Sequence, residues 1–162
     1  LGIDPGFGKM GYGIIKKTKS GLVLETAGLI ATSAAEEHHM RLSSIHNRLN
    51  ELIREHQPHI LSIERLFFAG NQKTAIPVAE ARGIALLTAG TAGLRVYEYT
   101  PPEIKRSLTG DGRADKKAMK KMVSLTLGTP MNSFNDDTVD AIALAIVAAY
   151  DRRNHLSRVE EK

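Results

Sequence analysis

The sequence of 162 residues contains no cysteine. This absence excludes disulfide bonds, iron–sulfur clusters and zinc sites built on thiolates. It also fits the reducing cytoplasm, which is the location that we expect. The six histidines show neither His-x-His nor His-Glu-x-x-His spacing, so we interpret them as surface or packing residues rather than metal ligands.

Long apolar runs are absent as well. The longest, around residues 141–150, is shorter than the ~20 residues that a membrane-spanning helix needs, so no membrane association is expected. No signal peptide is visible, and because the chain opens directly on strand-like Leu1-Gly2-Ile3, we expect that a few residues precede it. A chain of this length fits one domain that buries about two-thirds of its unfolded surface.

The sequence contains the residues of a nucleotide-binding glycine motif but lacks the helix that such a motif requires. Residues 6–11 read Gly-Phe-Gly-Lys-Met-Gly, but a dinucleotide site needs its third glycine to open a helix. Here Tyr12 to Lys16 continue as a strand, and the Gly-Lys-Ser/Thr ending of a phosphate-binding loop is missing. We interpret these glycines as a hairpin turn that also lets a backbone or a phosphate approach closely.

Hydrophobic periodicity predicts a mixed α/β domain. Strands are expected at residues 1–3, 12–17, 22–30, 60–63 and 94–99. A helix is expected to open at a capping box of Ser33 and Glu36 and to end near Gln57, before Pro58. Further helices are expected at residues 74–92, at 114–127 and from Asn135 or Asp136 onward. This order predicts a central five-stranded mixed sheet flanked by helices.

Positive charge is concentrated in one segment. The net charge is +4, and residues 103–121 hold seven basic and three acidic residues, so this segment accounts for the whole excess. The basic residues are Lys105, Arg106, Arg113, Lys116, Lys117, Lys120 and Lys121. Such a run is either a solvated helix face or a surface that binds phosphates.

Two acids stand where apolar strands end. Asp4 ends the first strand and Glu64 ends the fourth. If these strands are parallel neighbours, both side chains meet at the carboxyl edge of the sheet, where α/β proteins bind ligands. Each acid alone has a simpler explanation, a turn residue for Asp4 and a solvated strand end for Glu64.

Two more acids lie in the last helix. Asp137 and Asp140 are three residues apart and therefore project from one face, roughly 60° apart. Asp140 lies within an apolar stretch, where an unpaired carboxylate is costly to bury. A metal ion compensates such a charge, and oxygen ligands without histidine or cysteine favour Mg²⁺ or Mn²⁺. Asp136 leaves the register open, but the Asp-x-x-Asp spacing favours Asp137.

These residues resemble the RuvC family of bacterial Holliday-junction resolvases over essentially the whole chain. The matching stretches are residues 1–6 (Leu-Gly-Ile-Asp-Pro-Gly), 11–13 (Gly-Tyr-Gly), Ile63-Glu64 with Phe67 and Asn71, Ala81-Arg82-Gly83, and 137–141 (Asp-Thr-Val-Asp-Ala). The resemblance implies an RNase H-like fold and a homodimer that nicks two strands of a four-way DNA junction symmetrically, in homologous recombination and repair. It also implies the partners RuvA and RuvB.

Carried over residue by residue, the resemblance implies a catalytic, metal-binding set of acids: Asp4, Glu64, Asp137 and Asp140. Mg²⁺ is the expected metal, with Mn²⁺ able to substitute. We expect two ions per site, one activating water and one stabilising the leaving oxygen.

The expected DNA contacts lie beside these acids. Lys105 and Lys116 match family positions near the scissile backbone, and Phe67 matches an aromatic that inserts against bases at the crossover. Phe68 is either further aromatic surface or core packing. Arg113 and Lys117 belong to the basic segment, and we expect them to bind phosphates too.

We expect the nuclease domain to span residues 1–151. Residues 152–162 form a basic tail that is interpreted as a frayed terminus, with DNA contact as the other possibility. Three alternatives to a junction resolvase stay open at this point. They are a YqgF-like nuclease acting on RNA, a non-catalytic junction-binding module, and an actin-like ATPase, which shares the Asp-x-Gly opening but needs a second lobe.

Overall fold

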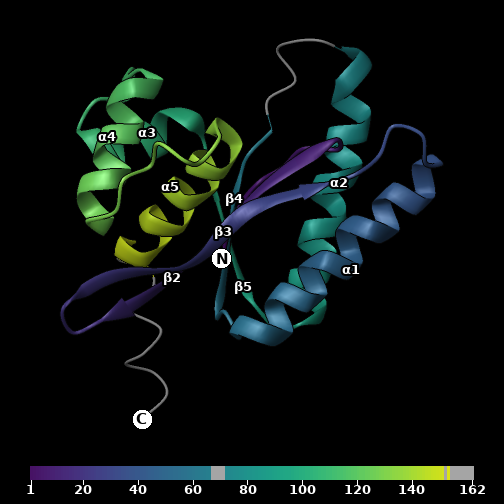
Figure 1. The fold of residues 1–162 in the computed structure, drawn as a ribbon, viewed down its shortest axis with the longest axis horizontal. Helices are drawn as coiled ribbons and strands as arrows, with labels where there is room; N and C mark the ends of the chain where they lie inside the picture. The colour runs from purple at the N-terminus through teal and green to yellow at the C-terminus, as the bar shows by residue number, and fades with distance from the viewer. Residues whose placement is uncertain (67–71, 152, 154–162) are drawn as a thin grey trace.

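The computed structural model describes residues 1–66, 72–151 and 153. Within them one five-stranded sheet lies between two groups of helices (Figure 1). The strands are β1 (Gly2–Asp4), β2 (Lys9–Thr18), β3 (Gly21–Ala31), β4 (Ile60–Glu64) and β5 (Arg95–Tyr99). The helices are α1 (His38–His56), α2 (Gln72–Thr91), α3 (Pro101–Thr109), α4 (Lys116–Leu127) and α5 (Asp136–Tyr150).

The sheet is mixed and has its shortest strand in the middle. The order is β3-β2-β1-β4-β5. Strands β2 and β3 form an antiparallel hairpin, and β1 pairs antiparallel with β2 but parallel with β4, which pairs parallel with β5. The predicted five-stranded mixed sheet is confirmed, and each predicted strand overlaps an observed one.

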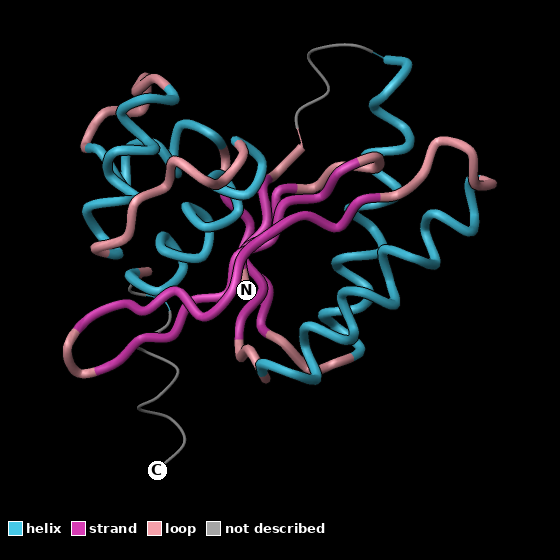
Figure 2. The backbone as a smooth tube through the Cα atoms, in the orientation of Figure 1, coloured by secondary structure: helices cyan, strands magenta, loops and turns pink. Residues whose placement is uncertain are grey.

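Helices cover both faces of the sheet (Figure 2). Helices α1 and α2 pack on one face, where the periodic residues Ile45 and Leu49 of α1 are buried in the same core as Ile3 of β1. Helices α3, α4 and α5 pack on the other face, around a second core that contains Val123 and Ile142. Residues 141–148 of α5 are all buried, which explains why this helix is apolar on almost every side.

Glycines allow α5 to lie directly on the central strands. A Cβ atom at Gly2 would lie 2.0 Å from the carbonyl oxygen of Ala141, and one at Gly11 would lie 2.0 Å from that of Asp137. No side chain larger than hydrogen fits at either position without moving the backbone of α5. The interpretation of Gly11 as a point of close backbone approach is therefore confirmed.

The start of α1 was predicted wrongly. The helix begins at His38, and its N-cap residue Glu37 accepts no side-chain cap hydrogen bond. Ser33 instead closes a turn ahead of the helix, because its carbonyl accepts from the amide of Glu36 and its Oγ from the amide of Ala35. The predicted end is confirmed, since Gln57 follows the helix in a left-handed conformation with φ 46°.

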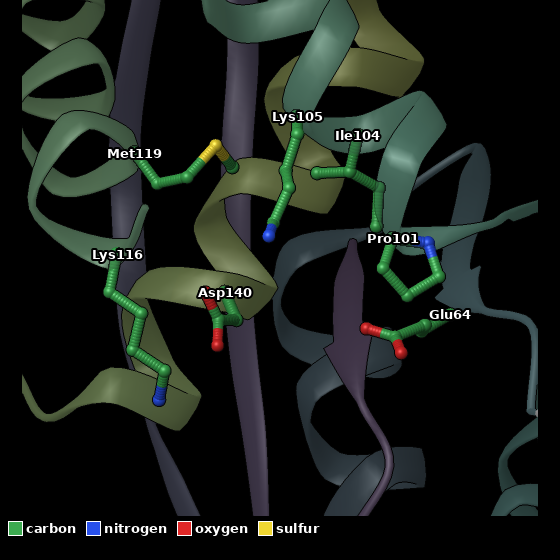
Figure 3. Close-up of a pocket in the computed structure, with 7 residues that line it drawn as sticks. All are labelled: Glu64, Pro101, Ile104, Lys105, Lys116, Met119 and Asp140. Carbon is green, nitrogen blue, oxygen red and sulfur yellow. The ribbon is translucent and has the colours of Figure 1, made fainter. Parts of the chain in front are cut away.

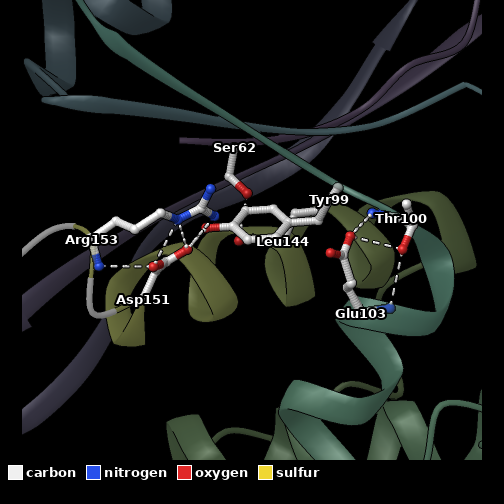
Figure 4. Close-up of polar contacts among 7 residues, drawn as sticks. All are labelled: Ser62, Tyr99, Thr100, Glu103, Leu144, Asp151 and Arg153. Carbon is white, nitrogen blue, oxygen red and sulfur yellow. Dashed lines mark hydrogen bonds and ion pairs between the residues drawn. The ribbon is translucent and has the colours of Figure 1, made fainter.

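Helix α3 is not predicted by the sequence pattern. Its capping box is Thr100 and Glu103, in which the Glu103 carboxylate accepts from the Thr100 amide at 2.7 Å and Thr100 Oγ1 accepts from the Glu103 amide (Figure 4). Pro101 occupies the first turn, where its missing N–H costs nothing. Helix α4 starts two residues later than predicted, because Asp115 caps it by accepting from the Ala118 amide.

None of the helices in the described ranges is long and apolar enough to cross a membrane.

We predict that Gly11→Ala destabilises the fold by about 2–3 kcal/mol, because the added methyl group must push α5 away from β2. Gly90→Ala in α2 is the matched control, since its Cβ would meet nothing within 4 Å and alanine favours helix. Urea unfolding of both variants measures the difference. Equal stability of the two variants would contradict the proposed contact.

Candidate active site

Asp4 and Glu64 lie at the same edge of the sheet, on neighbouring parallel strands. Ile3 pairs with Ile63 in the ladder, and each acid follows its buried isoleucine as the last residue of its strand. The buried Ser62 also fixes β4 to α5, because its Oγ donates to the carbonyl of Leu144 at 2.8 Å (Figure 4). The predicted convergence of these strand ends is therefore present.

The first turns of α5 bring two further acids to this edge. Asn135 caps the helix by accepting from the Thr138 amide at 2.9 Å. Asp137 is half-buried where its backbone meets Gly11, and Asp140 lies one turn further along. Asp136 is exposed and instead receives a hydrogen bond from Lys116 Nζ at 3.0 Å. The charge of Asp137 acts on Asp4, whereas that of Asp136 acts on Asp140, so the choice of Asp137 over Asp136 stays a prediction.

The four acids act on one another electrostatically. Burial first, and then the charges of Asp140, Glu64 and Asp137, together raise the pKa of Asp4 from its ordinary 3.8 to about 7, while Lys116 opposes them. Burial also raises the pKa of Glu64, with Asp140 as the second cause. The pKa of Asp140 is raised mainly by burial and lowered by Lys116. Negative charge is concentrated here in a partly dehydrated place.

The donor atoms at this edge suit a hard divalent cation, since they are all carboxylate oxygens. Across the described ranges, however, no three Asp, Glu or His side chains are close enough together to hold a metal ion as they stand. The fit to a metal therefore rests on the type of donor and on the shared electrostatic field. Coordination by all four acids stays a prediction.

A pocket of about 140 Å³ opens beside the acids (Figure 3). Glu64 and Asp140 line it together with Lys105 of α3 and Lys116 of α4. Its remaining lining is apolar: Pro101, Ile104 and Met119. Since a water molecule occupies about 30 Å³ in the liquid, the space suffices for a phosphate-sized group.

The apolar lining was not found from the sequence, because it depends on α3. The sequence Thr-Pro-Pro-Glu at residues 100–103 was the available signal, since it combines a capping box with proline at the first helical positions. Without this helix, Pro101 and Ile104 had no predicted place next to Glu64.

The other expected DNA contacts are distributed around the pocket. Lys105 is half-buried and reaches into it, whereas Lys116 is exposed at its rim. Arg113 and Lys117 are exposed and do not line it. Phe67, together with Phe68 and Asn71, lies outside the described residues, so the expected aromatic wedge stays a prediction. Most of the proposed tail also lies outside them, although Arg153 contacts Asp151.

Comparison with known proteins identifies relatives of this chain. The family described as "Crossover junction endodeoxyribonuclease RuvC" matches residues 1–148. The RuvC protein of Brachyspira hyodysenteriae is 45% identical over 153 residues, which cover 94% of this chain and 94% of the relative.

Solved structures agree with this result. The Thermus thermophilus RuvC structure superposes with a TM-score of 0.87 at 30% identity and covers 95% of both chains. The T. thermophilus RuvC structure in complex with Holliday junction substrate gives a TM-score of 0.84 at 28% identity and 94% coverage of both. The predicted RNase H-like fold is confirmed.

We predict an unusual pH dependence for Asp4. Because its pKa is about 7 in the folded chain and near 3.8 when unfolded, ionisation weakens the fold as the pH rises from about 4 through 7. Without divalent metal, Asp4→Asn should therefore raise the free energy of unfolding at pH 8 by about 1–3 kcal/mol. Solvent screening keeps the gain below the full value of roughly 4 kcal/mol that the pKa change implies.

At pH 4 the same substitution should have little effect. Asp136→Asn is the control of opposite sign, because Lys116 lowers the pKa of Asp136 and this pair is lost on substitution. Denaturant unfolding in EDTA at pH 4 and pH 8 measures both variants. If Asp4→Asn changed the free energy of unfolding by the same amount at both pH values, the carboxylate of Asp4 would not be one that burial and neighbouring charges keep from ionising.

Proposed function

We propose that this chain, which belongs to the RuvC family of crossover junction endodeoxyribonucleases, resolves four-way DNA junctions at one edge of its sheet. This is the edge where Asp4 and Glu64 end their strands, called the acidic edge below. It is a metal-dependent hydrolase of DNA. The finer proposal concerns which residues act and how. It assigns catalysis and metal binding to Asp4, Glu64, Asp137 and Asp140.

One arrangement supports this assignment: Asp4 and Glu64 end neighbouring parallel strands, and Asp140 lines the same pocket as Glu64. The pKa of Asp4 is raised to about 7 by burial and by three neighbouring carboxylates. A module that only bound DNA would gain nothing from such an acid cluster, because it repels phosphates. A divalent cation balances the charge, and we propose two Mg²⁺ ions, replaceable by Mn²⁺. Bound there, the metal supplies an activated water and stabilises the leaving oxygen in hydrolysis.

The surrounding residues position the DNA backbone. Lys105 and Lys116 stand at the pocket that Glu64 and Asp140 line, so their ammonium groups can hold the phosphate while the acids face its scissile bond. The apolar side chain of Ile104 limits water in the pocket. Arg113 and Lys117 extend the positive surface outward and are proposed to bind flanking phosphates, which gives affinity without sequence information.

The assembly is proposed from the nature of the substrate. A four-way junction must be nicked twice, on strands of like polarity, and one active site per chain then requires two copies. We therefore propose a homodimer that makes paired, symmetric nicks in homologous recombination and repair. Action with RuvA and RuvB, contact of Phe67 with the crossover, and the cytoplasmic location stay predictions.

The decisive test compares adjacent acids. We expect Asp137→Asn to reduce cleavage of a mobile four-way DNA junction in Mg²⁺ by a factor of at least about 10³, because it removes a carboxylate from the acidic edge. Asp136→Asn is the matched control and should stay within about tenfold of the unsubstituted chain, since Asp136 is exposed, does not line the pocket, and leaves Lys116 in place when its surface ion pair is lost.

Both variants should bind the junction without metal. Mapping of both nicks on the junction, and a parallel assay on structured RNA, complete the experiment. Unchanged cleavage by Asp137→Asn would refute the assigned mechanism. Faster cleavage of RNA than of the junction would favour the YqgF-like alternative.

We also predict that Lys116→Ala weakens junction binding and lowers the slope of log affinity against log salt by about one, as loss of one phosphate contact requires. The melting temperature should hardly change, because Lys116 is exposed and its ion pair lies at the surface. Lys19→Ala, in the turn between β2 and β3, is the control. If Lys116→Ala lowered the melting temperature but left the salt dependence of junction binding unchanged, Lys116 would have a structural role only.

A further inference from the structure

Arg82 of α2 joins the ends of two strands at the acidic edge. Its side chain is only 16% exposed, and its Nε donates to the backbone carbonyl of Glu64 at 3.1 Å. Its Nη2 forms an ion pair with the carboxylate of Glu98 on β5. The residue belongs to the Ala81-Arg82-Gly83 sequence, to which the proposed mechanism assigns no role.

The carbonyl of Glu64 needs this donor because the sheet cannot supply one. Ser62 donates its amide to Leu1, so Ser62 faces β1 in the ladder. Backbone groups alternate between the two neighbouring strands, and Arg65 donates to Tyr99 of β5, so Glu64 faces β1 again. If the parallel ladder continued, the amide of residue 5 would donate to the carbonyl of Glu64. That residue is proline, which has no N–H.

We propose that Arg82 is a positioning residue, which fixes the backbone of Glu64 in place of the missing rung and thereby aims the Glu64 carboxylate into the pocket. The inference rests on the proposed role of Glu64 in catalysis. Asp4 ends β1 and Pro5 follows it. Because Pro5 has no N–H, it cannot donate the hydrogen bond that would hold the backbone of Glu64 at the end of β4. Arg82 restores that support from the helical layer.

Glu98 explains why an arginine can stand here without acting as the counter-ion of Glu64. The guanidinium charge is taken up by Glu98, and the causes of the raised pKa of Glu64 are burial and Asp140. Arginine suits the position better than lysine, because its planar fork reaches the carbonyl and the Glu98 carboxylate from separate nitrogens.

The test uses the full chain with Arg82→Met, Arg82→Lys and Glu98→Gln. Arg48→Met is the matched control, because Arg48 is also ion-paired, to Glu51 on α1, but neither lines the pocket nor bonds to the backbone of Glu64. The first readout is hydrogen exchange of the Arg65 amide, which bonds to Tyr99 immediately after Glu64. The others are the rate of junction cleavage, the Mg²⁺ concentration for half-maximal cleavage, and junction binding in EDTA.

We expect Arg82→Met to speed exchange at Arg65 at least tenfold, to lower the maximal cleavage rate 10- to 100-fold and to raise the required Mg²⁺, with metal-free junction binding within twofold. Arg82→Lys should cleave faster than Arg82→Met. The cleavage rate of Glu98→Gln should lie between that of Arg82→Lys and that of the unsubstituted chain. Arg48→Met should change none of these readouts.

Two outcomes overturn the proposal. One is unchanged exchange at Arg65 in Arg82→Met. The other is a loss of cleavage that equals the unfolded fraction measured by melting, with no change in the required Mg²⁺, because Arg82 then only stabilises the fold. Glu64→Gln separates this failure from that of the proposed function. If Glu64→Gln cleaves normally while Arg82→Met still loosens Arg65, the role of Glu64 is wrong but its support by Arg82 stands.

Discussion

Helix α5 touches β1 and β2 through backbone atoms, and the geometry of the acidic edge depends on that contact. Gly2 and Gly11 leave no side chain between the layers. The first turn of α5, with Asp137, is therefore held against the strand that pairs with β1, and Asp4 is the last residue of β1. A helix held off by larger side chains would carry its acids away from the sheet. The proposed site is thus set by the close backbone packing of α5 on β1 and β2.

This packing has an electrostatic consequence. Burial is the first cause of the raised pKa at Asp4, Glu64 and Asp140, ahead of any neighbouring charge. The basic side chains that oppose it come from α3 and α4, and Lys116 remains exposed. Lys116 therefore stays toward solvent, where a phosphate can reach it, and does not neutralise the acids completely. The remaining negative charge is what favours a divalent cation.

Much of this could be predicted from the sequence, for identifiable reasons. The ends of β1 and β4 were readable because each is a short apolar run that stops at an acid, and the last helix because its apolar stretch is long. The start of α1 was wrong because Ser33 and Glu36 form a turn that imitates a capping box. Helix α3 was missed because it is short and its signal lies in Thr100 and Glu103 rather than in periodicity.

The four acids could be nominated from the sequence, and their joint role stays a prediction, whereas the pocket walls and the contact of Arg82 with Glu64 could not be derived from it. Spacing favoured Asp137 over Asp136, while the ion pair of the exposed Asp136 with Lys116 could be seen only in the structure. The pocket wall of Ile104 and Met119 depends on how α3 and α4 pack. The role of Arg82 could not be derived from its own sequence, because it answers a missing hydrogen bond on a strand far away in the chain.

The glycine contacts also bear on how this protein can vary and be redesigned. Because Gly2 and Gly11 face backbone atoms of α5 rather than its side chains, the helix-to-sheet spacing at these two points does not depend on apolar side chains further out in the core. Val123 of α4, for example, can then be exchanged to tune thermal stability while the acids keep their separation. The hydrogen atom that replaces Cβ at Gly2 and at Gly11 thus fixes the position of the acids and, at the same time, leaves the outer core free to vary.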